Sequence, residues 1–326
     1  MKFEFDKKQI QEISKKFSYS ATNVEKVIRL CCVLDDLNSL PPFEGKLLLK
    51  GGTAINLVAF QNLPRLSVDL DLDFAINVSK EDTLNYRQEI NDALNVYACE
   101  SGFQISDRSN YALDSKSLIY KTTTGSNDKI KLDINYHSRC HVYNPTETKI
   151  AFPFNASNKS IAIRHLSLVE LFASKIKALY ERCKPRDIFD VCTLAQSGLL
   201  ESPQDRENLR KCIVFYSILG NPDNPGLLQK DLSEIRKMPF QALKTQLLPM
   251  LHTKIGHFDK DLFFDTAISY LEKLIMISDA EAEFLNRFYS GEFHPELIFD
   301  NETALNLMSH PGVIRTLALI KALPRE

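Results

Sequence analysis

The segment from residue 66 to residue 74 alternates strictly between apolar and polar side chains. One set is Val68, Leu70, Leu72 and Phe74, and the other is Ser67, Asp69, Asp71 and Asp73. Successive side chains of a β-strand point to opposite faces, so this pattern predicts a strand with one buried face and one acidic face. The chain must therefore build a sheet that buries one side of this strand and gives the other side to polar groups.

The acidic face of this segment suggests a site for a divalent cation. Carboxylates at alternate strand positions lie about 7 Å apart and repel one another unless positive charge lies between them. Oxygen ligands without histidine or cysteine suit Mg²⁺ or Mn²⁺, which are usually shared with a substrate phosphate. Asp69 and Asp71 are therefore candidate metal ligands. The alternative is a solvated strand face with an acidic bias.

A glycine turn precedes the acidic segment. The apolar run at residues 46–50 stops at Gly51 and Gly52, and Thr53 opens a predicted helix that continues to about Gln61. Unpaired backbone N–H groups and the dipole at a helix start attract phosphate. The Thr53 hydroxyl could both cap this helix and contact a phosphate oxygen. The alternative is that the two glycines mark only a tight turn.

A second alternating segment, at residues 128–138, carries a lone acid, Asp133, on its polar side. If the two alternating strands are neighbours in one sheet, Asp133 approaches Asp69 and Asp71. Three carboxylates could then hold two metal ions, an arrangement that stabilises the attacking and leaving oxygens in displacement at phosphorus. The alternative is a solvated surface acid.

The stretch ASKIKALYERCKPRDIFDV, at residues 173–191, predicts two helices separated at Pro185. Their charged candidates are Lys175 and Arg182 on one stripe of the first helix, and Arg186, Asp187 and Asp190 at the start of the second. The two aspartates are three residues apart and share a helix face. The alternative is a solvated basic stripe, with acids that offset a helix dipole.

The length of the chain and the change in its hydrophobic pattern, from strand-like alternation to helical periodicity, predict two domains. Residues 1–160 read as two N-terminal helices followed by mixed strands and helices, with strand-like runs at 102–107 and 115–123, and residues 161–326 read as helical. The net charge of −2 gives no global attraction to nucleic acid. Seven cysteines without CxxC spacing favour neither disulfides nor zinc, and no signal peptide or membrane span is apparent, so we expect a cytoplasmic protein.

Together these motifs resemble the AbiEii/AbiGii toxin family of nucleotidyltransferase-like proteins, related to the MenT toxins and to the polymerase-β-type nucleotidyltransferases. The matching stretches are LLKGGTAINL at 48–57, RLSVDLDLDF at 65–74, KLDIN at 131–135 and KIKALYERCKPRDIFDV at 175–191. The resemblance covers about residues 46–200. It implies an α+β fold, in which a polymerase-β-like mixed-sheet domain precedes a mainly helical domain.

The resemblance also implies an activity, transfer of a nucleotide from a nucleoside triphosphate to an acceptor hydroxyl with Mg²⁺ or Mn²⁺. The acceptor would be RNA, with a tRNA 3′ end as one option, and the protein would be the toxin of a toxin–antitoxin or phage-defence system with a cognate antitoxin encoded nearby. The implied metal ligands are Asp69, Asp71 and Asp133. The implied nucleotide-binding residues are Gly51, Gly52, Thr53, Lys175, Arg182 and Arg186. Lys175, Asp187 and Asp190 complete the implied catalytic set.

Two features depart from the family pattern: threonine at position 53, where serine is common, and the extra acid Asp73, to which the sequence assigns no role. Two other functions are alternatives. A phosphatase with Asp69 or Asp71 as covalent nucleophile would explain the acids but neither the glycine turn nor the helix pair. A degenerate domain that only binds a partner would not need three convergent acids. Neither a calcium loop nor a P-loop fits these motifs.

Overall fold

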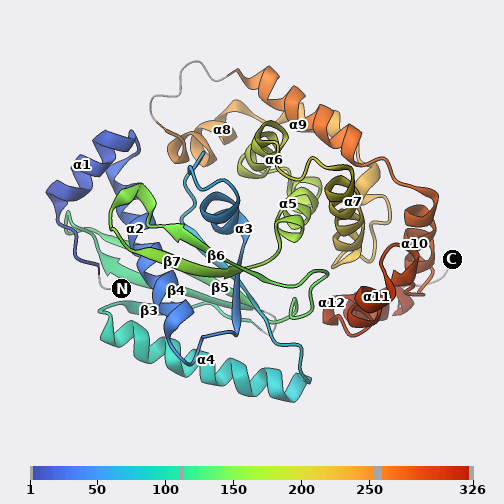
Figure 1. Cartoon of the computed structure of the whole chain (residues 1–326), viewed down its shortest axis with the longest axis horizontal. Helices are drawn as coiled ribbons and strands as arrows, with labels where there is room; N and C mark the ends of the chain where they lie inside the picture. The colour runs from blue at the N-terminus through green and yellow to red at the C-terminus, as the bar shows by residue number, and fades with distance from the viewer. Residues whose placement is uncertain (1–2, 111–112, 253–258, 323–326) are drawn as a thin grey trace. The chain divides into compact units, whose positions relative to one another are not determined.

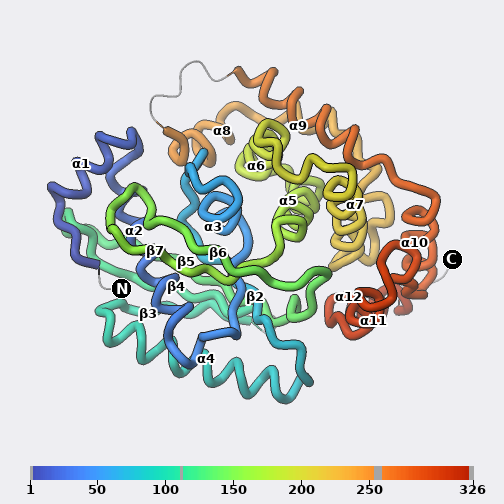
Figure 2. Tube along the Cα trace, in the orientation of Figure 1, coloured from blue at the N-terminus to red at the C-terminus, as the bar shows by residue number. Residues whose placement is uncertain are grey.

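The computed structural model describes residues 3–110, 113–252 and 259–322. The chain forms two compact units. The first comprises Met1–Arg139, Pro145–Leu166 and Pro249–Gly256, and the second comprises Cys140–Asn144, Ser167–Leu248 and His257–Glu326. Each unit is discontinuous along the chain. Figure 2 traces the chain with its colour running by residue number from the N-terminus to the C-terminus.

The first unit is built on a mixed sheet. Within the described residues the strand order is β3-β4-β5-β2-β1-β7-β6. The bounds are β1 Leu47–Lys50, β2 Asp69–Phe74, β3 Gln104–Asp107, β4 Leu113–Lys121, β5 Asn127–Asn135, β6 Thr146–Ala151 and β7 Ser160–His165. The pairs β2–β5 and β1–β7 are parallel, and the other neighbours are antiparallel.

This sheet is accompanied by α1 Lys7–Phe17, α2 Ala21–Ser39, α3 Gly51–Ala54 with its π-helical continuation Ile55–Ala59, α4 Lys80–Glu100 and the short 3₁₀ helix Pro153–Asn155. The long helices α2 and α4 lie along the apolar side of the sheet (Figure 1). There Phe74 of β2 is fully buried and its ring centroid lies 5.6 Å from that of Tyr86 in α4. The apolar half of the alternating segment is thus buried, which leaves its acidic half on the other face.

The second unit is helical. Its helices are α5 Leu168–Arg182, α6 Pro185–Ser197, α7 Pro203–Ile218, α8 Phe240–Gln246, α9 Lys260–Leu274, α10 Asp279–Tyr289, α11 Asn301–Leu307 and α12 Pro311–Ala322. Helix α5 packs against α6 and α7, and α6 packs against α9. Aromatic rings fill part of its core, where the buried Phe215 contacts the partly exposed Phe299 and the buried His310 edge to face.

The predicted α+β class is confirmed, with a mixed sheet and a helical unit. The sequence did not predict β6 or β7, both of which lie in the first unit. The acidic strand also begins at Asp69 and not at residue 66, because the Leu66 N–H donates to the carbonyl oxygen of Met250 at 2.8 Å and not to a strand. None of the helices in the described part of the chain has the length and apolar composition that a membrane crossing requires.

Candidate active site

The predicted acids lie in one row across the sheet. In the strand pairings Lys50 of β1 is opposite Asp71 of β2, Asp71 is opposite Asp133 of β5, and Asp133 is opposite Ser115 of β4. Side chains directly opposite one another share a face, with β-carbons about 5 Å apart. Asp69 lies two residues before Asp71 on the same face. The prediction that the two alternating strands are neighbours, with Asp133 on the side of Asp69 and Asp71, is confirmed.

The glycine turn lies directly against this row. Gly51 has φ +69°, and a β-carbon added there would lie 2.4 Å from Oδ2 of Asp71. Any other residue would therefore be strained in its backbone and would collide with the carboxylate. This contact brings the turn and the acidic strand together.

Arg65 is the functional candidate that sequence reasoning missed. Its side chain is fully buried, and its Nη2 would lie 2.5 Å from a β-carbon on Gly52. Its Nη1 donates to the carbonyl oxygen of Leu66 at 3.0 Å, and its backbone N–H donates to the side chain of Asn56. Asn56 in turn donates to the carbonyl oxygen of Gly52 at 2.7 Å. Because Gly52 has no side chain, the buried guanidinium of Arg65 fits beside it and supports the turn. In the sequence, an arginine that precedes a strand does not indicate that it is buried or that it contacts a turn.

Thr53 does not cap the helix, which corrects the sequence-based expectation. Helix α3 begins at Gly51, its N-cap is Lys50, and no side chain makes the cap hydrogen bond. The buried Thr53 hydroxyl donates instead to the carbonyl oxygen of Asp69 at 2.5 Å and lies 3.0 Å from the Ser67 hydroxyl. The reason is that the turn packs onto β2, so this hydroxyl ties the helix to the acidic strand.

Asp73 has a role that the sequence did not assign. It is buried, and its Oδ1 lies 2.5 Å from Nζ of Lys50, an ion pair without hydrogen-bond geometry. Lys50 immediately precedes the glycine turn and is about three-quarters buried. Asp73 therefore neutralises the lysine that begins the turn.

Asp133 is held by two neighbours. Ser115 donates to its Oδ1 at 2.7 Å, and Lys131 donates to its Oδ2 at 2.5 Å. Partial burial opposes the charged form of Lys131, but its hydrogen bond to Asp133 and the charges of Asp133, Asp71 and Asp69 raise its pKa overall. Lys131 is thus a protonated cation among the carboxylates.

The three aspartates fit a hard divalent cation in donor chemistry and in their shared face. All are oxygen donors on adjacent strands, the ligand type that Mg²⁺ and Mn²⁺ prefer. In the described part of the chain, however, no three acidic, histidine or cysteine side chains are gathered closely enough to hold a metal ion as they stand. Ser115 and Lys131 donate to the two oxygens of Asp133, so an incoming cation competes with them for this carboxylate.

The predicted residues of the helix pair form a separate cluster within the second unit. Nζ of the buried Lys175 lies 2.9 Å from Asp187 and 3.1 Å from Asp190, so the two aspartates share a face as predicted. Arg182 donates from Nε to Asp187 at 2.8 Å. Burial opposes ionisation of Asp187, but Lys175 and Arg182 outweigh it and lower the pKa of that carboxyl. Arg186 is half-buried in the first turn of α6.

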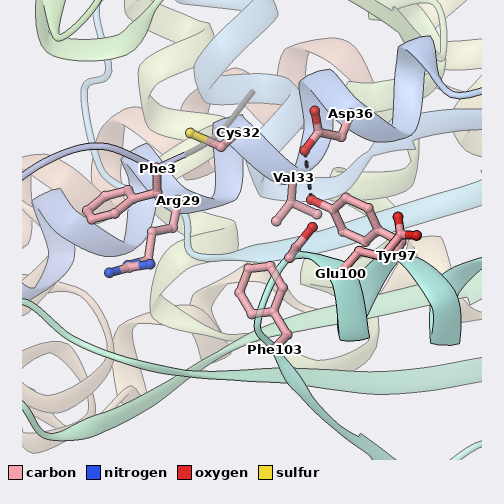
Figure 3. A pocket seen from close by; sticks show the side chains of 9 residues that line it. Phe3, Arg29, Cys32, Val33, Asp36, Tyr97, Glu100 and Phe103 are labelled. Carbon is pink, nitrogen blue, oxygen red and sulfur yellow. Dashed lines mark hydrogen bonds between the residues drawn. The ribbon is translucent and has the colours of Figure 1, made fainter.

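A pocket of about 340 Å³ lies between α2 and the end of α4 (Figure 3). It is lined by Phe3, Arg29, Cys32, Val33, Asp36, Tyr97, Glu100, Ser101 and Phe103, none of which the sequence singled out. Tyr97 donates to Asp36 at 2.9 Å across it, and burial raises the pKa of the Cys32 thiol to about 11. The pocket therefore offers no reactive thiolate and none of the predicted carboxylates.

Comparisons with known proteins place most of the chain in one family. A family model described as nucleotidyl transferase AbiEii toxin, type IV toxin–antitoxin system, matches residues 32–265. Among solved structures, the nucleotidyltransferase toxin MenT4 of Mycobacterium tuberculosis H37Rv matches with a TM-score of 0.57 and 14% identity, over 97% of this chain and 99% of that chain. At this identity the match shows a shared fold. No curated protein matches the chain. The resemblance predicted from the sequence is confirmed.

Proposed function

This chain belongs to the AbiEii nucleotidyl transferase toxin family of type IV toxin–antitoxin systems, and from that premise we propose that it transfers a nucleotide to an acceptor hydroxyl of RNA. One observation carries the proposal. Asp71 is at once the register partner of Asp133 and the carboxylate against which Gly51 packs. A phosphate cradle and a pair of carboxylates therefore meet at one side chain, which is what phosphoryl-group chemistry needs.

Different residues of the first unit have different roles in this reaction. The backbone N–H groups of Gly51, Gly52 and Thr53, which lie in the first helical turn, hold the triphosphate tail. Asp69, Asp71 and Asp133 would hold Mg²⁺ or Mn²⁺, which when bound would supply positive charge to the phosphates and make the acceptor hydroxyl more acidic. The acceptor oxygen bonds to the α-phosphorus, its proton passes toward Asp133, and the bond to pyrophosphate breaks.

For the cluster in the second unit we propose two roles. Lys175 and Arg182, with Arg186, neutralise phosphate charge, as cations do in phosphoryl transfer. Asp187 and Asp190 position Lys175, because both contact its ammonium in the structure. The paired geometry supports positioning directly, and the family supports the phosphate contact.

We propose two partners. A toxin of a type IV system implies a cognate antitoxin, and an RNA acceptor, with a tRNA 3′ end as one option, supplies the hydroxyl. The net charge of −2 means that such an RNA is held by local basic groups and not by the overall field.

The test is to incubate the purified protein and Mg²⁺ with each α-labelled ribonucleoside triphosphate and total cellular RNA. We expect label in RNA, and none with Asp71→Asn. Asp128→Asn is the matched control, because it makes the same change on the opposite face of β5. A phospho-aspartate without transferred nucleotide would instead indicate a phosphatase, and tight triphosphate binding without turnover would indicate a binding module.

A further inference from the structure

Lys131 lies among the candidate metal ligands on the acidic face of the sheet. It is the register partner of Asp69 in the pairing of β2 with β5, and it lies two residues before Asp133 on the same face of β5. Its ammonium donates to Oδ2 of Asp133 at 2.5 Å. It therefore neutralises one of the carboxylates that the proposed function assigns to a divalent cation.

The ammonium of this pair has access to water. The Lys131 side chain is 47% exposed, so its ammonium can be hydrated when it leaves Asp133, whose side chain is 14% exposed. Lys50, another lysine of this face, differs because it pairs with Asp73, whose side chain is only 3% exposed. A buried carboxylate that lost its partner would be left uncompensated, so this second pair is fixed.

We propose that Lys131 is a displaceable counter-ion of the candidate metal site, which yields Asp133 to an incoming divalent cation and then binds the triphosphate. The proposal rests on the proposed function. It explains why Asp133 pairs with Lys131 while Asp69, Asp71 and Asp133 are not close enough together to hold a metal ion as they stand.

The displaced ammonium then has a new partner. Once a cation binds Asp133, the Lys131 ammonium lies beside carboxylates whose charge is already neutralised. Its flexible four-carbon side chain lets it move, and the triphosphate is the anion that can pair with it. Lys131 therefore opposes binding of the metal alone and favours binding of the metal with the nucleotide. By thermodynamic reciprocity, the nucleotide must tighten the metal by the same factor by which the metal tightens the nucleotide.

The experiment measures two affinities of the whole protein. Mn²⁺ binding is followed by the electron paramagnetic resonance signal of free Mn²⁺, without nucleotide. Binding of the α,β-methylene analogues of the four ribonucleoside triphosphates is followed by calorimetry at saturating Mn²⁺. The variant is Lys131→Gln, and the control is Lys129→Gln, which removes the same charge from the same face of β5 one step farther from the aspartates.

We expect Lys131→Gln to bind Mn²⁺ about fivefold more tightly than the wild type and the nucleotide analogue about tenfold more weakly, in the range of typical coupling between sites. Lys129→Gln should stay within about twofold of the wild type in both, as expected for a more distant, solvent-screened charge. Lys131→Arg, which keeps the charge, should restore both affinities. If Lys131→Gln and Lys129→Gln have equal Mn²⁺ affinities, the proposal is overturned.

Asp71→Asn separates this failure from failure of the proposed function. If Asp71→Asn loses Mn²⁺ while Lys131→Gln binds it like the wild type, the metal site stands and only the counter-ion role is wrong. If Asp71→Asn binds Mn²⁺ as tightly as the wild type, the metal is not at this row, and both proposals are wrong.

Discussion

A β-carbon on Gly51 would lie 2.4 Å from Oδ2 of Asp71, so the glycine turn and the acidic strand can approach only because position 51 has no side chain. The turn is also strained for any other residue, since φ at Gly51 is +69°. These two demands have different causes, namely backbone conformation and contact with the carboxylate. They can be separated by experiment.

Replacing Gly51 by alanine should therefore damage activity more than stability. The positive φ costs about 1–2 kcal/mol of folding free energy, and displacement of Asp71 should lower nucleotide transfer by about 100-fold or more. The control is Gly125→Ala, where φ is +88° and nothing lies within 4 Å of the added carbon. Urea denaturation and a transfer assay should show similar stability losses in the two variants but normal transfer in the control. Normal transfer by Gly51→Ala would show that the contact with Asp71 does not matter.

Thr53 provides a test of the correction described above. Thr53→Val removes the hydroxyl that bonds to the carbonyl oxygen of Asp69 while keeping the shape, and should cost about 1–2 kcal/mol in urea denaturation. Thr53→Ser keeps the hydroxyl and should retain most of the stability. If the valine variant were as stable as the wild type but bound nucleotide more weakly, the hydroxyl would be a phosphate ligand and not a tie between helix and strand.

The sequence predicted the parts of this site that depend on local pattern. Alternation in residues 66–74 and 128–138 is sufficient to place Asp69, Asp71 and Asp133 on polar strand faces, and only one neighbour relation was needed to bring them together. The glycine turn was equally predictable, because two adjacent glycines between an apolar run and a helix indicate a turn between a strand and that helix. These features depend on residues close together in the chain.

The parts that were missed depend on contacts between distant residues. The Arg65 guanidinium is buried because Gly52 leaves space for it, and Asp73 is paired because Lys50 precedes the turn on the neighbouring strand. Strand β7 was not predicted, although Leu49 of β1 is the register partner of His165 at its end. No local sequence pattern predicts such partners, so only the three-dimensional structure identifies them.

Lys175 should be essential to the stability of the second unit. Lys175→Met removes the cation that contacts both of the buried aspartates, Asp187 and Asp190, and should cost about 3–5 kcal/mol. The control is Lys177→Met in the same helix, where the ion pair to Glu181 is partly exposed and is worth about 1 kcal/mol or less. Thermal and urea denaturation measure both variants. A Lys175→Met variant as stable as the control, but inactive, would assign the lysine to the nucleotide alone.

Glu170 should make stability depend on pH. It is fully buried at the start of α5 and accepts hydrogen bonds from Tyr216 and from the backbone of Val142 and Tyr143. Burial raises its pKa from 4.5 to about 7. The folded protein therefore holds this proton more tightly than the unfolded chain does, so its contribution to stability falls as pH rises from about 4.5 through about 7 and is constant beyond.

The size of this effect is about 3 kcal/mol across that window. Free energies of unfolding at pH 5, 6, 7 and 8 should therefore fall more steeply in the wild type than in Glu170→Gln, which cannot titrate. The glutamine variant should be less stable at pH 5, since its amide N–H₂ faces backbone donors. Parallel pH profiles for the two proteins would mean that Glu170 does not titrate in this range.

The most direct measurement of the whole account is the single-turnover rate of nucleotide transfer by Asp133→Asn. Asp133 is assigned to the site by one relation, its place opposite Asp71 across β2 and β5. We predict a rate about 100-fold or more below the wild type with an unchanged circular dichroism spectrum, and a rate within about twofold of the wild type for Asp128→Asn. Transfer by Asp133→Asn at the wild-type rate would contradict the account, because the row of carboxylates would then not be where the chemistry occurs.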